Sequence, residues 1–177
     1  ANKISEKITL IVGFDKESIL KKSKNFGFDL SFCEQPEPKG TGDAVKRGIN
    51  EVTDAEKVLV LYGDVPLIKE KTLKELINNC NDGISILTTV LDNPHGYGRV
   101  KKDNDGNATS IIEEKDATED EKKIKEIFTG VLCARADYLR GALPEINNNN
   151  AAGEFYLTDI VSIMSKKGIN INTYIAS

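Results

Sequence analysis

The residues with the clearest potential for chemistry are Tyr62, Gly63 and Asp64, which directly follow the apolar run 58–61. Ligands of open α/β sheets bind outside the carboxyl ends of the strands. There Gly63 would let a ligand approach the backbone, and Asp64 would offer Mg²⁺ a hard oxygen ligand beside substrate phosphates. A run of Gly, Asp, Val and Pro is also common in a turn that simply leaves a strand. The pattern alone does not decide between these two interpretations.

A second candidate is the segment 35–42, which ends in Lys39-Gly40-Thr41-Gly42 before an expected helix. Glycines at this place expose N–H groups at the positive end of the helix dipole, which suits a phosphate or the polar edge of a base. Gln35 can offer a nucleobase both a donor and an acceptor. The spacing matches neither the Walker P-loop nor the dinucleotide GxGxxG motif, so an ordinary loop is the alternative interpretation.

A third candidate combines the segment 96–99, which contains Gly98, with the acidic group 113–116. Gly98 could admit a sugar or a phosphate against the backbone, and Glu113 could accept a hydrogen bond from a sugar hydroxyl. A solvated surface turn is the alternative for the acidic group, and residue types alone favour it. His95 is the only histidine, and no Ser or Cys nucleophile motif accompanies it. We interpret it as a surface residue.

Alternating strands and helices are expected to position these candidates. Apolar runs predict strands at 8–12, 30–33, 58–62 and 84–91, and helical spacing predicts helices at 15–24, 44–52 and 72–80. This order predicts an α/β fold with a parallel sheet, helices on both faces and the run 58–62 at the centre of the sheet.

The second half of the chain predicts a mixed arrangement. Short strands are expected at 97–102, 109–114 and 127–134, and the turn 103–107 predicts a hairpin between the first two. Helices are expected at 136–143 and 155–167, and a last strand at 169–174. With no internal repeat and no linker, we expect one domain: a mostly parallel mixed sheet with a small appended β lobe.

Composition narrows the classes of partner. The chain has 177 residues, 39% of them hydrophobic and 29% charged, with a formal net charge of −4. This is typical of a soluble globular protein and argues against a nucleic-acid partner. No apolar stretch approaches the roughly 18 residues that span a bilayer, so no membrane partner is expected. Three separated cysteines without a CxxC pair argue against structural zinc and fit free thiols in a reducing cytoplasm.

Five segments, taken together and in order, resemble the bacterial N-acetylglucosamine-1-phosphate uridyltransferases, the N-terminal domain of a bifunctional enzyme. The matching segments are Gln35 with Gly40-Thr41-Gly42, the run VLVLYGDVPL at 58–67, GYGR at 96–99, IEEKDAT at 112–118 and NNNAAGEFYLTD at 148–159. Five ordered motifs are far more specific than one. The resemblance therefore favours the functional interpretation at each candidate, and it implies the Rossmann-like nucleotide-diphospho-sugar transferase fold.

The resemblance also implies roles for individual residues. Uracil contacts would come from Gln35, Gly40 and Thr41, and the nucleotide would be lined by Tyr62, Gly63 and Asp64, with Asp64 on Mg²⁺. The N-acetylglucosamine would be held by Gly98, Glu113, Tyr156 and Thr158. In the implied reaction, N-acetylglucosamine-1-phosphate attacks the α-phosphate of UTP, which gives UDP-N-acetylglucosamine and pyrophosphate. Such catalysis relies on positioning and charge neutralisation and needs no side-chain nucleophile.

The chain departs from the family pattern in several places. The family opens on a strand and a Gly-rich LAAGxGTRM loop with a Pro-Lys downstream, and it carries a second Mg²⁺-ligating Asn beyond the position of Ser177. We therefore expect 1–177 to be one partial domain with little or no activity alone. The resemblance implies that the full-length protein is a cytoplasmic homotrimer, assembled through a C-terminal left-handed β-helix domain.

One departure lies inside the expected sugar pocket. Phe128 stands where the family usually has an Asn before Thr-Gly. Because Phe cannot donate to a sugar hydroxyl, either that contact is lost or the register differs locally. Two alternatives to the uridyltransferase thus remain: a nucleotidyltransferase for another sugar-1-phosphate, and a non-catalytic module that binds a nucleotide sugar or a protein.

Overall fold

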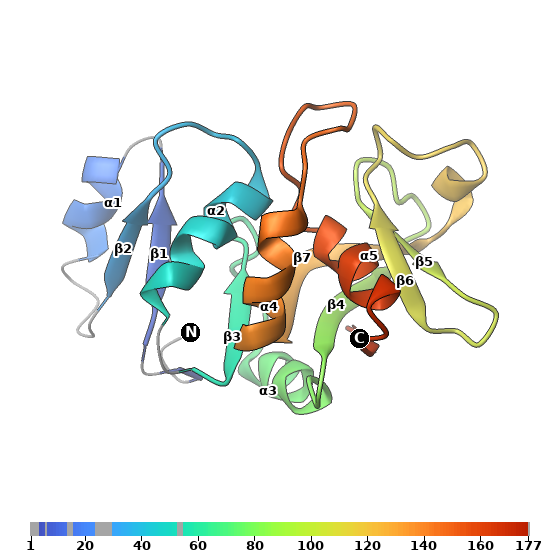
Figure 1. Ribbon diagram of the computed structural model, residues 1–177, viewed down its shortest axis with the longest axis horizontal. Helices are drawn as coiled ribbons and strands as arrows, with labels where there is room; N and C mark the ends of the chain where they lie inside the picture. Colours follow the sequence, from blue (N-terminus) through green and yellow to red (C-terminus); the bar gives the residue numbers. More distant parts are fainter. Residues whose placement is uncertain (1–3, 6, 14–15, 24–29, 53–54, 177) are drawn as a thin grey trace.

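The computed structural model describes residues 4–5, 7–13, 16–23, 30–52 and 55–176, and Figure 1 shows their arrangement. Its strands are β1 (Thr9–Val12), β2 (Ser31–Glu34), β3 (Lys57–Leu61), β4 (Ile84–Val90), β5 (Arg99–Lys102), β6 (Ala108–Ile112), β7 (Glu126–Arg135) and β8 (Ile171–Ile175). Its α-helices are α1 (Lys16–Ser23), α2 (Thr41–Gly48), α3 (Glu70–Asn79), α4 (Ala136–Ala142) and α5 (Asp159–Lys166), and short 3₁₀ turns are η1 (Ile49–Glu51), η2 (Glu121–Lys123) and η3 (Leu143–Glu145).

The main sheet is mixed, and β7 lies at its centre. Its hydrogen-bonded order is β6-β5-β7-β4-β8, with β3 also paired to β7. β7 runs antiparallel to both β3 and β4, whereas β4 and β8 are parallel. Strands β3, β4 and β8 therefore share one direction. The predicted α/β class is confirmed, but the expectation of mostly parallel pairing is wrong, because the long strand β7 from the second half of the chain separates β3 from β4.

Helices cover both faces of this sheet, as predicted. Along β4 and β7, Ile86 and Leu132 point to one face, while Leu87 and Val131 point to the other. The first face buries residues of α2, α4 and α5, and the second buries Leu73 and Leu76 of α3. This alternation follows from the period of two along a strand, which forces a sheet buried on both faces to be apolar throughout.

Strands β1 and β2 form a separate parallel pair, at the left of Figure 1. Helix α2 ties this pair to the main core, because Gly48 packs closely against Ile11 of β1 while Val45 is buried in the first-face core. Within the described part of the chain, β3 forms a ladder with β7 only. One edge of β3 and one edge of β1 are therefore free of strand pairing.

The predicted hairpin is confirmed. β5 and β6 pair antiparallel, and the turn between them is closed by a bond from Asp103 N to Asn107 O of 2.9 Å. Figure 1 shows this hairpin at the far end of the sheet from β1 and β2, which matches the expected appended β lobe.

The helix expected at 155–167 begins only at Asp159. The backbone N–H of Phe155 donates instead to Lys39 O, and that of Leu157 donates to Thr41 Oγ1. These long-range bonds hold 155–158 in an irregular conformation, and sequence periodicity does not report them. The predicted ends of the first helix at Asp15 and Lys24 lie outside the described residues.

The free thiols were predicted correctly. Cys80 and Cys133 are buried and Cys33 is half-buried, all three as free cysteines. A hydrogen bond between the Cys80 and Cys133 side chains is the main cause of their shifted pKa values: it lowers the pKa of Cys80 and raises that of Cys133. Together with Leu87 and Val131 they belong to the second-face core, so they serve packing.

Candidate active site

The loop that leads from β2 into α2 is held closely against the loop before α5. Gly40 adopts φ 109°, and a Cβ at this position would lie 2.5 Å from Phe155 O. Only glycine fits both the conformation and the approach. Gly42 N donates to Phe155 O over 2.7 Å, and Phe155 N donates to Lys39 O over 2.8 Å. The glycines singled out as a possible anion site thus also join two segments distant in sequence.

Thr41 is a junction between the expected uracil and sugar residues. Its Oγ1 accepts a 3.1 Å hydrogen bond from the backbone N–H of Leu157, the neighbour of Tyr156 and Thr158. The Thr41 hydroxyl also bonds the Tyr62 hydroxyl. Residues predicted to read different parts of a substrate are therefore joined by direct bonds.

Tyr62 lies half-buried at the end of β3. Burial raises the pKa of its hydroxyl to about 12, with smaller contributions from the nearby charges of Glu113 and Asp64. Its ring lies against Gly130, where a Cβ would approach within 2.5 Å, and meets the Phe128 ring edge-on at a centroid distance of 6.3 Å. A neutral hydroxyl is thus held between the expected metal ligand and the expected sugar ligand.

Asp64 follows in the turn after β3 and is exposed. Within the described residues its carboxylate takes part in no hydrogen bond or ion pair, and no three His, Cys, Asp or Glu side chains group as a metal site. Gly63 beside it has open space in the direction of a Cβ. An unpaired carboxylate next to open backbone fits a hard cation that takes its other ligands from phosphates and water.

Glu113 closes the other side of the site. Its Oε1 accepts a 2.9 Å hydrogen bond from Thr158 Oγ1. Burial raises the pKa of Glu113, and the charge of Asp116 raises it further against the effect of the Thr158 bond. A Cβ on Gly98 would lie 2.8 Å from Ile111 Cγ2 and 3.4 Å from Glu113 Oε2. The absent side chain of Gly98 therefore makes room for Glu113.

Arg99 of β5 pairs with Glu114, which follows the end of β6. Its side chain is 2% exposed, and its Nη2 donates to Glu114 Oε2 over 2.6 Å. Gly96 N donates to the same oxygen over 3.2 Å. These bonds fix the position of Glu114, the sequence neighbour of Glu113. His95 is 81% exposed, as predicted for a surface residue.

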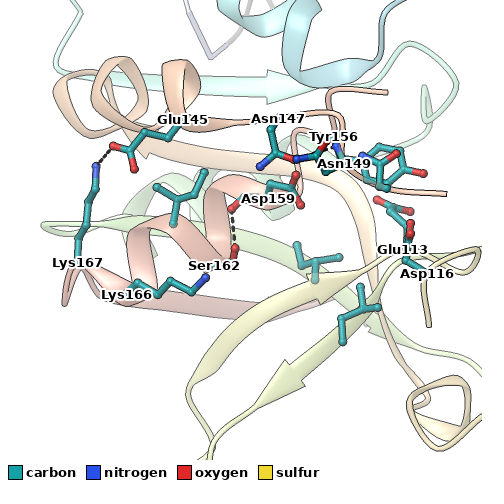
Figure 2. A pocket seen from close by; sticks show the side chains of 14 residues that line it. Glu113, Asp116, Glu145, Asn147, Asn149, Tyr156, Asp159, Ser162, Lys166 and Lys167 are labelled. Atoms are coloured by element: carbon teal, nitrogen blue, oxygen red, sulfur yellow. Dashed lines mark hydrogen bonds and ion pairs between the residues drawn. The ribbon is translucent and has the colours of Figure 1, made fainter. Parts of the chain in front are cut away.

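A cavity of about 660 Å³ begins at Glu113 and Tyr156 and continues along α5 (Figure 2). Of the predicted site residues, Glu113 and Tyr156 line it and Asp64 does not. Asp159 and Asp116 also line it. Burial raises the pKa of Asp159, and the charges of Glu113 and Asp116 raise it further. Lys166 and Lys167 also line the cavity; Lys166 partly offsets the raised pKa of Asp159, and Lys167 pairs with Glu145.

Sequence reasoning missed part of this cavity. Asn147 and Asn149, which Figure 2 shows beside Tyr156, were not among the predicted site residues. Asp159 was quoted within a matching motif but given no role. The acidic and amide residues of 147–159 were the available signal. Tyr156 itself lies near Asp116 and Glu113, and burial followed by their charges raises its pKa.

All ten predicted site residues therefore belong to one connected region. Gly40 and Thr41 contact the 155–158 loop, and Gln35 bonds Gly40. Tyr62 bonds Thr41 and lies near the charges of Glu113 and Asp64. Whether each one binds a ligand stays a prediction.

Solved structures share this fold. A protein described as a glucose-1-phosphate thymidylyltransferase from Bacillus anthracis, solved with sucrose, aligns with a TM-score of 0.74 over 96% of this chain and 68% of its own, at 20% identity. HddC from Yersinia pseudotuberculosis aligns with a TM-score of 0.68 over 98% and 71%, at 18% identity. At such identities the likeness shows the fold, which is that of nucleotide-sugar transferases.

Sequence comparison then gives the family. A nucleotidyl transferase family profile matches residues 6–168, and the chain belongs to that family. The bifunctional protein GlmU of Alcanivorax borkumensis is 41% identical over 165 residues, covering 93% of this chain and 36% of the relative. The GlmU of Dechloromonas aromatica is 42% identical over 168 residues, covering 95% and 37%. The chain thus spans about a third of the length of these curated relatives.

Two further findings concern a metal ion and a membrane. Members of the nucleotidyl transferase family generally use a divalent metal ion. That Asp64 binds one stays a prediction. No helix within the described ranges has the length and apolar character needed to cross a membrane.

Proposed function

We propose that the full-length protein transfers UMP from UTP to N-acetylglucosamine-1-phosphate, giving UDP-N-acetylglucosamine and pyrophosphate. The observation that carries this proposal is that Thr41 bonds the Tyr62 hydroxyl and also accepts from Leu157 N, next to Thr158, whose hydroxyl donates to Glu113. These contacts join a base-sized loop to a polar cavity across the end of β3, where a nucleotide sugar would lie. Membership of the nucleotidyl transferase family and the identity to GlmU proteins support the reaction and the substrates.

In this proposal the chain's residues act by positioning. Gln35, Gly40 and Thr41 hold uracil, while Gly98, Glu113, Tyr156 and Thr158 hold the sugar. Asp64 would hold Mg²⁺, which would supply charge neutralisation to the phosphates when bound. Gly63 leaves the backbone open to the phosphate chain, and Tyr62 keeps a neutral hydroxyl between the negative groups.

We also propose that the domain is completed by a further strand and Gly-rich loop. The free edges of β3 and β1 support this, because an unpaired edge inside a sheet presents a row of N–H and C=O groups that another strand would satisfy. The cytoplasmic location and the homotrimer rest on the resemblance alone. Sedimentation of the full-length protein tests the trimer, and cell fractionation tests the location.

The test of the reaction is pyrophosphate release by the full-length protein with UTP, Mg²⁺ and a series of sugar-1-phosphates. We expect N-acetylglucosamine-1-phosphate to give the highest kcat/KM. Equal or faster turnover of a non-acetylated sugar would overturn the substrate. Binding of UDP-N-acetylglucosamine by calorimetry without any turnover would instead favour a non-catalytic module.

One observation favours a second candidate, a nucleotidyltransferase for another sugar-1-phosphate. Phe128 is 6% exposed and packs against Tyr62. The pairing of β4 with β7 is irregular directly after it, since Thr88 opposes Phe128 while Ile86 opposes Leu132. An apolar ring in this wall offers a sugar no hydrogen bond. Under this candidate a sugar with fewer polar groups turns over best, and Phe128→Asn shifts the preference toward N-acetylglucosamine-1-phosphate.

A further inference from the structure

Both amide hydrogens of Gln35 are already engaged within the protein. Its Nε2 donates to Gly40 O over 3.0 Å and to Asp43 Oδ2 over 2.9 Å. A glutamine amide has two N–H donors and one carbonyl acceptor. Among the residues that the structure describes, none donates to Gln35 Oε1. Gln35 can therefore offer a ligand an acceptor, but no donor.

The chemistry of the two partners sets the orientation of this amide. Gly40 O and the Asp43 carboxylate are both acceptors without a hydrogen to give. Rotating the amide by half a turn would place Oε1 against both of them and remove two hydrogen bonds. Of the two partners, only Asp43 contributes through its side chain, so it is the one that substitution can remove.

Asp43 is itself held in place. It lies in the first turn of α2, and its Oδ2 also accepts a 2.9 Å bond from Arg47 Nε, one helical turn later. The carboxylate is 16% exposed. Burial raises the pKa of Asp43, but the bonds from Arg47 and Gln35 outweigh it and leave the pKa below its usual value. The carboxylate is thus ionised at neutral pH and acts as a fixed acceptor.

We propose that Asp43 is a positioning residue that locks Gln35 with Oε1 free, so that the site selects a base with an imino N–H. Uracil carries a hydrogen on N3, whereas cytosine has a lone pair there and would meet Oε1 acceptor to acceptor. The inference rests on the proposed role of Gln35 at the base, and it adds what decides which base is accepted.

The first test uses the unaltered full-length protein with UTP, CTP and N3-methyl-UTP as alternative substrates. We expect kcat/KM for UTP to exceed that for CTP by about 100-fold or more, because a buried polar group left unpaired strongly rejects the wrong ligand. N3-methyl-UTP, which lacks the imino hydrogen, should fail as CTP does. CTP or N3-methyl-UTP within threefold of UTP would overturn the acceptor role of Gln35.

The second test removes the Asp43 carboxylate that orients Gln35. In Asp43→Ala, Gln35 can turn its Nε2 toward cytosine N3, so we expect the preference for UTP over CTP to fall about tenfold, with KM for UTP raised about fivefold and kcat little changed. Asp43→Asn keeps an oxygen that accepts from both Gln35 and Arg47, and should restore the preference. Glu37→Gln is the matched control, since this exposed carboxylate in the same loop pairs only with Lys39.

Failure of the inference is distinguishable from failure of the proposed function. An unchanged UTP-to-CTP ratio in folded Asp43→Ala would overturn the role of Asp43 while the uridyl transfer stands. Loss of preference in Asp43→Asn as complete as in Asp43→Ala would do the same. No turnover of any nucleoside triphosphate by the unaltered protein would overturn the proposed function itself. If Asp43→Ala does not fold, Asp43→Ser, too short to reach Gln35, takes its place with the same expectations.

Discussion

The two ends of the candidate site differ in how their charged side chains are paired. At the loop after β2, every side chain that we assign to base recognition is paired: Gln35 with Asp43, and Asp43 with Arg47. At the sugar cavity, Glu113 and Asp159 lie near one another and both have raised pKa values through burial. If both ends bind substrate as we propose, the base would meet a fixed hydrogen-bonding pattern, and the sugar would meet a polar cavity rich in carboxylates.

This contrast has a physical reason. A planar base is read by one fixed hydrogen-bond pattern, so a locked amide gains selectivity. A sugar presents several hydroxyl donors, and buried carboxylates accept from them once they are ionised. Asp64, which we propose as the metal ligand, has an exposed carboxylate. Four substitutions test whether these parts are separable, from the largest expected effect to the smallest.

Removing Asp64 should lower turnover strongly and leave the binding of the base and the sugar almost unchanged. In full-length Asp64→Ala we expect kcat to fall about 10²- to 10³-fold, because a bound metal ion stabilises the transition state by several kcal/mol. UTP and sugar-phosphate affinity, measured by calorimetry, should change far less. Asp92→Ala is the control, an exposed aspartate paired with Lys125 outside the site. Normal Mg²⁺-dependent turnover by Asp64→Ala would show that the metal assignment is wrong.

Removing Arg99 should damage the sugar end through stability. Arg99→Ala removes a side chain that is only 2% exposed, together with its bond to Glu114, and we expect the lost packing to cost about 3 kcal/mol of unfolding free energy. The matched control is Lys101→Ala in the same strand: the Lys101 side chain is 51% exposed, so the loss of its pair with Glu121 should cost much less stability. Urea denaturation monitored by circular dichroism measures both. Equal losses for the two variants would contradict the anchoring role of Arg99.

Gly40→Ala should weaken the contact between the loop before α2 and the loop 155–158. The added Cβ meets Phe155 O in a backbone conformation that alanine rarely adopts, so we expect a loss of about 2 kcal/mol and a higher KM for both substrates. Gly106→Ala isolates the backbone strain, since Gly106 has φ 86° but open space around it. If the two variants lose equal stability and keep equal KM values, the contact between the loops contributes nothing.

The smallest effect concerns pH. Burial raises the pKa of Asp159 in the folded state, so the folded protein binds more protons than the unfolded chain between the two pKa values. Stability therefore falls as pH rises from about 4, the usual value of an aspartate, through the raised folded value. Asp159→Asn should remove this loss and raise the melting temperature at neutral pH by about 2 °C. An identical pH profile for variant and parent would contradict the assignment.

The elements of the first half were predictable because each carries its own signal. Alternation between apolar strands and amphipathic helices predicted β1 to β4 and α1 to α3 to within a few residues, and the turn 103–107 predicted the β5–β6 hairpin. The order of the strands was not predictable in the same way. Both β3 and β4 pair with β7, whose partner residues lie 36 to 78 positions further on, and no local pattern encodes such a pairing.

The same division holds for the site. Residue types and their spacing alone identified Asp64, Glu113 and the Gly40-Thr41 loop as candidates, because carboxylates and glycines at strand ends carry recognisable chemistry. Only the tertiary structure decided that Phe155 and Leu157 bond this loop rather than begin α5, that Asp159 faces Glu113, and that Asp43 uses both acceptor and charge to orient Gln35. Hydrogen bonds between distant segments depend on where the chain returns, and the sequence near each residue does not contain that information.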